Sequence, residues 1–116
     1  MKALGVFREH ELAGKPKKDE EMIKLTGKEL EMRGLQVELK HPRELREADA
    51  DLIFTMARGE KTINLLINAE KRGAVVVNSP GAVRISLNRK ITYTLLKKEK
   101  VNIPKTRIVT LNDVPK

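Results

Sequence analysis

Residues 75–106 decide the fold, and they read VVVNSPGAVRISLNRKITYTLLKKEKVNIPKT. The run Val75-Val76-Val77 is apolar, as in a buried strand, and the turn formers Asn78-Ser79-Pro80 follow it directly. A strand that delivers a polar turn to the start of a helix often presents backbone N–H groups to an anion or a nucleotide. The stretch therefore predicts a strand end that faces a ligand.

Two helices are predicted after this strand. Pro80 suits the first position of a short helix that Ser79 caps. A second helix runs from its cap, Asn88, to Lys100. Asn102 suits the left-handed residue after that helix, and Pro104 prevents its continuation.

Strands and helices alternate toward the N-terminus. The predicted strands are Ala3–Phe7, Gln36–Lys40, Leu52–Met56 and Ala74–Val77; a helix from an Asp19 cap to Gly34, a turn at Arg43–Ala48 and a helix at Glu60–Arg72 connect them. This order predicts a parallel sheet with right-handed crossovers. Only Gln36–Lys40 alternates polar and apolar residues, so it is placed at an edge, in the strand order 2-1-3-4. The predicted fold class is α/β: a Rossmann-like open parallel sheet with flanking helices.

The first of these helices is predicted to pack on the sheet through one apolar stripe. Its predicted members are Met22, Ile23, Leu25, Leu30 and Met32. Gly27 lies inside the helix, where glycine is unfavourable by about 1 kcal/mol relative to alanine. Close packing against the sheet is the predicted reason for it.

Composition bounds the class of protein. The 116 residues suit one domain, and 24 basic against 16 acidic residues give a net charge of +8, which favours anionic partners. For most single lysines, plain solvation is the simpler interpretation. With 3% aromatic residues the chain offers no strand for base stacking, which disfavours nucleic acid.

Several site classes are excluded by the sequence. The chain has no cysteine, hence no disulfide, thiolate metal site or cysteine nucleophile. Neither histidine, His10 nor His41, has partners at a metal-binding or catalytic spacing, so no catalytic residue and no metal ligand is assigned. Nucleotide-binding glycine motifs are absent. No apolar run approaches the length of a membrane span or a signal sequence, so the expected location is cytoplasmic.

Polar residues follow three of the predicted strands, where open parallel sheets bind ligands. These residues are Arg8-Glu9-His10, Arg58-Gly59 and Asn78-Ser79. Two guanidinium groups at neighbouring strand ends, from Arg8 and Arg58, could clamp a carboxylate or phosphate. The alternative is that either arginine pairs with Glu9, Glu11 or Glu60 of the chain itself.

Lys90 stands in the first turn of a predicted helix, against the positive end of the helix dipole. A bound anion would make this placement favourable. The alternative is a solvated residue at the helix start, like its neighbour Arg89.

The stretch also resembles a known family. The residues that carry the resemblance are Asn78-Ser79-Pro80-x-Ala82, Asn88-Arg89-Lys90, Leu95-Leu96 and 101–106, VNIPKT. They are similar to the entry into ATP-grasp ligases, in the branch of glutathione synthetase and the ribosomal-protein-tail glutamate ligases. The family usually has Asp where Arg89 stands and Gly where Asn102 stands. The resemblance implies a pre-ATP-grasp α/β domain over residues 1–100, and over 101–116 a linker and first strand, at Arg107–Leu111, leading into an ATP-grasp domain.

The resemblance also implies roles. Lys90 would contact the ATP phosphates, and Asn78 and Ser79 would line the substrate side, where Arg8 and Arg58 are the other candidate substrate ligands. The complete enzyme would use ATP and Mg²⁺ to join a small-molecule carboxylate to an amine, and its relatives are often homodimers. This chain lacks counterparts of the ATP-grasp domain, so it is expected to be a fragment or half of a split enzyme, inactive alone and without a tightly bound cofactor. The alternative is a non-catalytic α/β module that binds an anionic small molecule or a partner protein.

Overall fold

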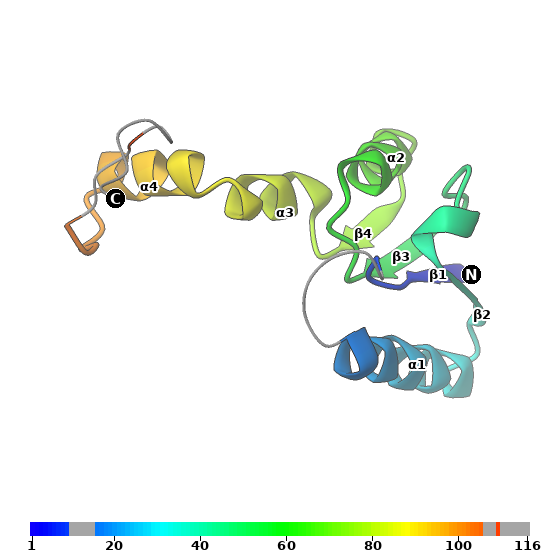
Figure 1. Ribbon diagram of the computed structural model, residues 1–116. Coiled ribbons are helices and arrows are strands. Elements are labelled where there is room, and N and C mark those ends of the chain that lie inside the picture. Colours follow the sequence, from blue (N-terminus) through cyan, green and yellow to red (C-terminus); the bar gives the residue numbers. More distant parts are fainter. Residues whose placement is uncertain (10–15, 106–108, 110–116) are drawn as a thin grey trace. The chain divides into compact units, whose positions relative to one another are not determined.

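The computed structural model describes residues 1–9, 16–105 and 109. The chain forms two compact units, Met1–Arg84 and Ile85–Lys116. The first unit contains the sheet and its covering helices (Figure 1). The predicted division into 1–100 and 101–116 stays a prediction.

The first unit is built on one four-stranded parallel sheet. Its strands are β1 (Lys2–Val6), β2 (Gln36–Lys40), β3 (Leu52–Thr55) and β4 (Val75–Val77). Their order is β2-β1-β3-β4, and every neighbouring pair is parallel. The predicted α/β fold, an open parallel Rossmann-like sheet with the strand order 2-1-3-4, is confirmed.

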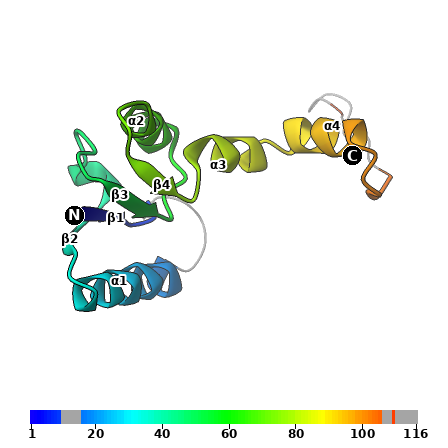
Figure 2. The same ribbon diagram turned by 180° about the vertical axis from the view of Figure 1, so that it is seen from behind.

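Helices cover both faces of this sheet. Helix α1 (Pro16–Met32) lies on one side and α2 (Glu60–Lys71) on the other (Figure 1; Figure 2). Beneath α2, and beside the short 3-10 helix η1 (Pro42–Glu44), the larger core contains Leu4, Val6, Leu45, Ala48, Ile53, Ala57, Leu66, Ala69 and Val76. Beneath α1 the core contains Ala3, Phe7, Ile23 and Phe54. Apolar side chains from alternate positions of β1 and β3 therefore contribute to both core layers.

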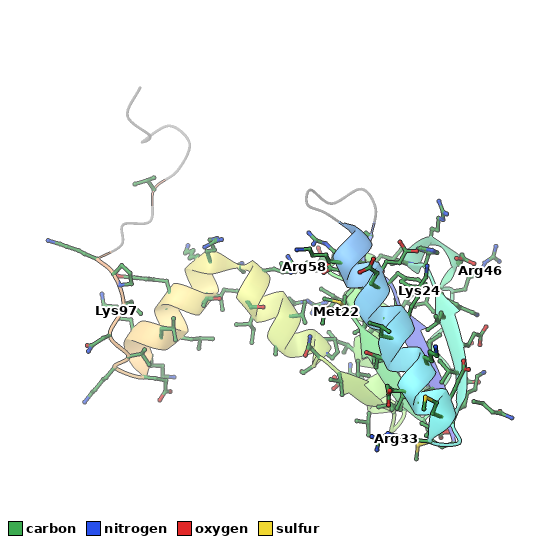
Figure 3. All side chains as sticks on the ribbon, turned by 90° about the horizontal axis from the view of Figure 1, so that it is seen from below. Met22, Lys24, Arg33, Arg46, Arg58 and Lys97 are labelled. Carbon is green, nitrogen blue, oxygen red and sulfur yellow. The ribbon has the colours of Figure 1, made fainter. Side chains whose placement is uncertain are left out.

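The stripe that α1 buries differs from the predicted one. Ile23 is buried, Leu30 is partly buried, and Met22, Leu25 and Met32 are 57%, 64% and 73% exposed. Figure 3 labels Met22 on the flank of α1. The prediction was wrong for these three residues because the inward face follows the i, i+4, i+7 spacing of Ile23, Gly27 and Leu30.

Gly27 lets α1 approach the sheet. A Cβ atom at this position would lie 3.3 Å from both Val37 Cγ1 and Leu39 Cδ2 of β2. The start of α1 also departs from prediction. The helix begins at Pro16, so Asp19 lies in its first turn and is not its cap.

A left-handed glycine follows each covering helix, and Gly34 was predicted to end the first of them. Gly34 and Gly73 adopt left-handed φ angles of 92° and 102°. Behind them, Leu35 N–H donates to Leu30 O and Ala74 N–H donates to Ala69 O, which satisfies carbonyl groups in the last helical turns.

Gly5 of β1 marks the closest contact between the sheet and its neighbours. A Cβ atom there would lie 2.6 Å from Leu39 Cδ2 and 2.6 Å from two ring carbons of Phe54. We expect Gly5→Ala to lower the free energy of unfolding by about 1–2 kcal/mol, because the buried Phe54 ring must shift. Urea denaturation measures this loss. Gly81→Ala is the control, since its nearest neighbour, Ser79 Oγ, would be 4.0 Å away; equal losses in both variants would contradict the steric explanation.

Two short helices follow β4. Helix α3 (Pro80–Leu87) begins in the first unit, where Ser79 Oγ accepts the Ala82 N–H at 3.4 Å and Arg84 donates to Asn64 Oδ1. The predicted Ser79 cap is confirmed.

Helix α4 (Arg89–Lys98) lies in the second unit. Asn88 Oδ1 accepts the Ile91 N–H at 3.1 Å, so the predicted Asn88 cap is also confirmed. The left-handed residue after α4 is Lys100, with a φ of 58°, and the prediction of Asn102 was wrong. The helix ends earlier than expected, and Val101 N–H donates to Leu96 O to close it. The predicted strand Arg107–Leu111 lies outside the described residues except for Val109.

Candidate functional site

The carboxyl ends of β1 and β3 form the centre of the candidate site. The chain passes from β1 outward to β2 on one side and from β3 outward to β4 on the other, so the strand order reverses between β1 and β3. Open α/β sheets bind ligands in the crevice at such a point. Arg8 and Glu9 follow β1, and Arg58 and Gly59 follow β3. We call these four residues, with Asn78 and Ser79 after β4, the strand-end rim.

Glu9 joins the two central strand ends. Its Oε2 accepts the Arg58 N–H at 2.8 Å, and its Oε1 accepts the Gly59 N–H at 2.8 Å. Gly59 is the N-cap of α2 and has no side chain with which to cap the helix. The Glu9 carboxylate, just after β1, therefore accepts the N-cap N–H, as the glutamate of a capping box would, and lies near the positive end of the α2 dipole.

Sequence reasoning gave Glu9 no such role. Two features of the sequence could have indicated this role. They are a glycine in the capping position before α2 and a carboxylate just after the neighbouring strand. The contact also explains the glycine, because a Cβ atom on Gly59 would lie 2.8 Å from Glu9 Oε1.

Arg8 binds a carboxylate of the chain itself. Its Nη1 lies 3.1 Å from Asp19 Oδ2 in the first turn of α1, and the two side chains are 14% and 18% exposed. The pair links the end of β1 to α1. The sequence considered an internal partner for Arg8 but not Asp19, because Asp19 was assigned to cap α1.

Arg58 is the exposed arginine of the rim. Only its backbone N–H takes part in the hydrogen bonds found between described residues, and its guanidinium belongs to none of their ion pairs. Figure 3 shows its side chain at the surface of the first unit, at the end where α1 begins. The structure thus brings Arg8 and Arg58 to neighbouring strand ends, with one guanidinium engaged and the other accessible.

Asn78 and Ser79 extend the rim by one strand. β3 pairs with β4 in the register Phe54↔Val77, so the turn after β4 adjoins the segment after β3. Both residues are exposed. Ser79 accepts a backbone N–H of α3, as described above, and the Asn78 side chain has no hydrogen bond to any described residue.

Lys90 occupies the first turn of α4 and is exposed. Its carbonyl accepts the Thr94 hydroxyl at 2.8 Å, and its ammonium belongs to no ion pair of the described residues. Lys90 belongs to the second unit and the rim to the first. Their joint contact with one ligand stays a prediction.

His41 adds no catalytic group to the described part of the rim. His41 is partly buried, and its ring stacks on Phe7 with centroids 4.5 Å apart, so it is a packing residue. His10 lies outside the described residues. Within the part of the chain that the structure describes, no group of three His, Asp or Glu side chains is arranged to hold a metal ion.

Comparison with known proteins gives no relative: no family model, no curated protein and no solved structure matches the chain. The ATP-grasp resemblance therefore depends on the residues quoted for it. No helix in the described ranges is both long enough and apolar enough to cross a membrane.

Proposed function

We propose that the chain is the N-terminal substrate-binding domain of an ATP-dependent carboxylate–amine ligase of the ATP-grasp type. The observation that supports this best is the capped start of α4, where Asn88 orders the turn that presents the exposed Lys90 after the polar turn of β4. The open parallel sheet and its polar rim suit such a domain, but folds of this kind serve many functions.

In this proposal the rim binds the carboxylate substrate. Arg58 is its main ligand, because a guanidinium group can hold a carboxylate through two parallel hydrogen bonds. Asn78 and Ser79 line the same side, and Arg8 orders the rim through Asp19. The Arg58 and Gly59 N–H groups already donate to Glu9, so the Arg58 side chain is the group that binds the substrate carboxylate in this proposal.

Lys90 would contact the ATP phosphates. An ATP-grasp domain would contribute most contacts to ATP and Mg²⁺, which in the complete enzyme convert the carboxylate to an acyl phosphate for attack by the amine. A homodimer is compatible with the resemblance. The second candidate is a non-catalytic module that binds an anionic small molecule or partner protein; the net charge of +8 and the accessible Arg58 favour it.

A titration of this chain with Mg·ATP, followed by amide NMR, tests the role of Lys90. We expect weak binding, with a Kd in the millimolar range, because one ammonium group and a helix start provide little of the affinity for a nucleotide. The shifts should centre on the first turn of α4. Lys90→Ala should reduce them severalfold.

Lys98→Ala is the matched control, because it removes the same charge from the last turn of α4. It should leave the shifts near Lys90 intact. Tight ATP binding by the chain, or equal effects of the two substitutions, would count against the ligase proposal and favour the second candidate.

A further inference from the structure

A second concave site lies at the amino ends of the strands, opposite to the strand-end rim. It is a cavity of about 410 Å³ between the loop that leads into β3 and the turn that follows α2. Four small residues contribute to its lining: Ala48, Ala50, Ala69 and Ala74. Asp49, Asp51, Arg72 and Lys2 give it charge, and the Lys2 ammonium lies 3.9 Å from Glu38 Oε2. All of these residues belong to the first unit.

Arg72 spans the two walls of this cavity. Its Nη2 donates to Ala48 O at 3.0 Å, which fixes the guanidinium against the opposite loop. A guanidinium group has several further N–H donors in the same plane. Arg72 can therefore bind an anion without giving up its contact with Ala48.

The acidic side of the cavity is formed by the two aspartates. Asp51 Oδ2 accepts the Lys2 N–H at 2.9 Å, which holds that carboxylate at the start of β3. Asp49 is exposed. Ion pairs within 4 Å, where the structure describes both partners, include neither aspartate nor Arg72. The lining of this cavity therefore carries opposite charges that are not joined in an ion pair.

We propose that this cavity binds a small zwitterion, namely a free α-amino acid with a short apolar side chain. The ligand carboxylate would bind Arg72, its ammonium would bind Asp49, and its side chain would lie against Ala50 and Ala74, the partly buried alanines of the lining. The last turn of α2 supports the ammonium, since the C-terminal end of a helix dipole is negative. The cavity volume lies within the range for ligand sites, toward its small end, so a ligand of this size can enter.

The charge pattern disfavours simpler ligands. An anion without an ammonium would place its charge beside Asp49 and Asp51, and a cation without a carboxylate would place its charge beside Arg72. Only a molecule with both groups offers an opposite charge to the aspartates and to Arg72 alike. The site is independent of the proposed ligase function, because none of its residues belongs to the strand-end rim.

Amide NMR titration of the 116-residue chain with L-alanine tests this proposal. Propionate and ethylamine are the comparison ligands, since propionate is alanine without its ammonium and ethylamine is alanine without its carboxylate. We expect saturable shifts at the amides of Ala50, Gly73 and Ala74. Both comparison ligands should bind roughly tenfold more weakly or worse, because each loses one charge-assisted contact.

Substitutions distinguish binding at the cavity from a general effect of the charge of the protein. Asp49→Asn and Arg72→Gln should each weaken L-alanine binding roughly tenfold. Glu47→Gln and Arg43→Gln change the same charges at exposed positions outside the cavity and should leave binding unchanged. Asp49→Asn is the deciding variant if Arg72→Gln fails to fold, because no described residue depends on the Asp49 side chain.

Three outcomes would overturn the proposal. They are the absence of shifts at the cavity amides, equal responses to alanine and propionate, and unchanged alanine binding by Asp49→Asn. If the cavity amides do not shift and the shifts are confined to Gly59 and Asn78, the amino acid binds at the strand-end rim instead. Failure here leaves the ATP titration unaffected, since that experiment reads the first turn of α4.

Discussion

Ile53→Ala is expected to lower the free energy of unfolding of the first unit by about 3–4 kcal/mol. Ile53 is fully buried in β3, a central strand of the sheet, and packs in the larger core with Val6 and Leu66. The substitution removes several buried carbon atoms and leaves a cavity. Because β3 pairs with a strand on each side, it cannot move to close that cavity. The loss would be a large share of the stability of a domain of this size.

The measurement must follow the first unit. The single tyrosine, Tyr93, lies in the second unit, so its fluorescence reports on α4. Hydrogen exchange at the amides of β1 and β3 reports on the sheet directly. Val75→Ala is the control, because Val75 is 60% exposed on β4 and should cost well under half as much. Similar losses for the two variants would show that the buried layer under α2 does not hold the unit together.

The sheet could be predicted from the sequence because its signals are local. Each interior strand is a short apolar run, and the alternation in Gln36–Lys40 identifies the edge, which is enough to order four strands. Asn88, Ser79 and Gly73 mark helix ends through their own backbone and side-chain chemistry. Such residues need no knowledge of the rest of the fold.

The inward face of α1 could have been found from spacing alone but was obscured by Gly27. A glycine does not count as a hydrophobic residue in a periodic pattern, so the prediction used the larger side chains of Met22 and Leu25 and chose the wrong face. Lys100 was missed for a different reason. Lysine has no preference for the left-handed region, and its place there depends on where α4 ends.

The partners of the charged residues could not be predicted. Arg8 pairs with Asp19 and Glu9 with the segment before α2, across separations of 11 and of 49 and 50 residues. The sequence offered several carboxylates for each arginine and nothing local to choose between them. The cavity at the amino ends was equally hidden, since the loop before β3 and the turn after α2 meet only in the folded sheet.

Glu9→Ala is expected to lower the free energy of unfolding by about 3 kcal/mol, because it removes two hydrogen bonds to an ionised acceptor. The N–H groups of Arg58 and Gly59 would lose their acceptor at the start of α2. Denaturation followed by hydrogen exchange at those two amides measures both the global and the local effect. Glu9→Gln should lose roughly half as much, since one oxygen of the amide can still accept.

Glu60→Gln is the matched control, because it removes a carboxylate from the first turn of the same helix and should cost less than about 1 kcal/mol. The consequence for the proposed function is separate from stability. Glu9 fixes the backbone from which the Arg58 side chain extends, so Glu9→Ala should weaken binding of a carboxylate substrate at the rim even where the sheet stays folded. If hydrogen exchange at the Arg58 and Gly59 amides is unchanged in Glu9→Ala, Glu9 is not the link between β1 and α2. Another contact must then fix the backbone at Arg58.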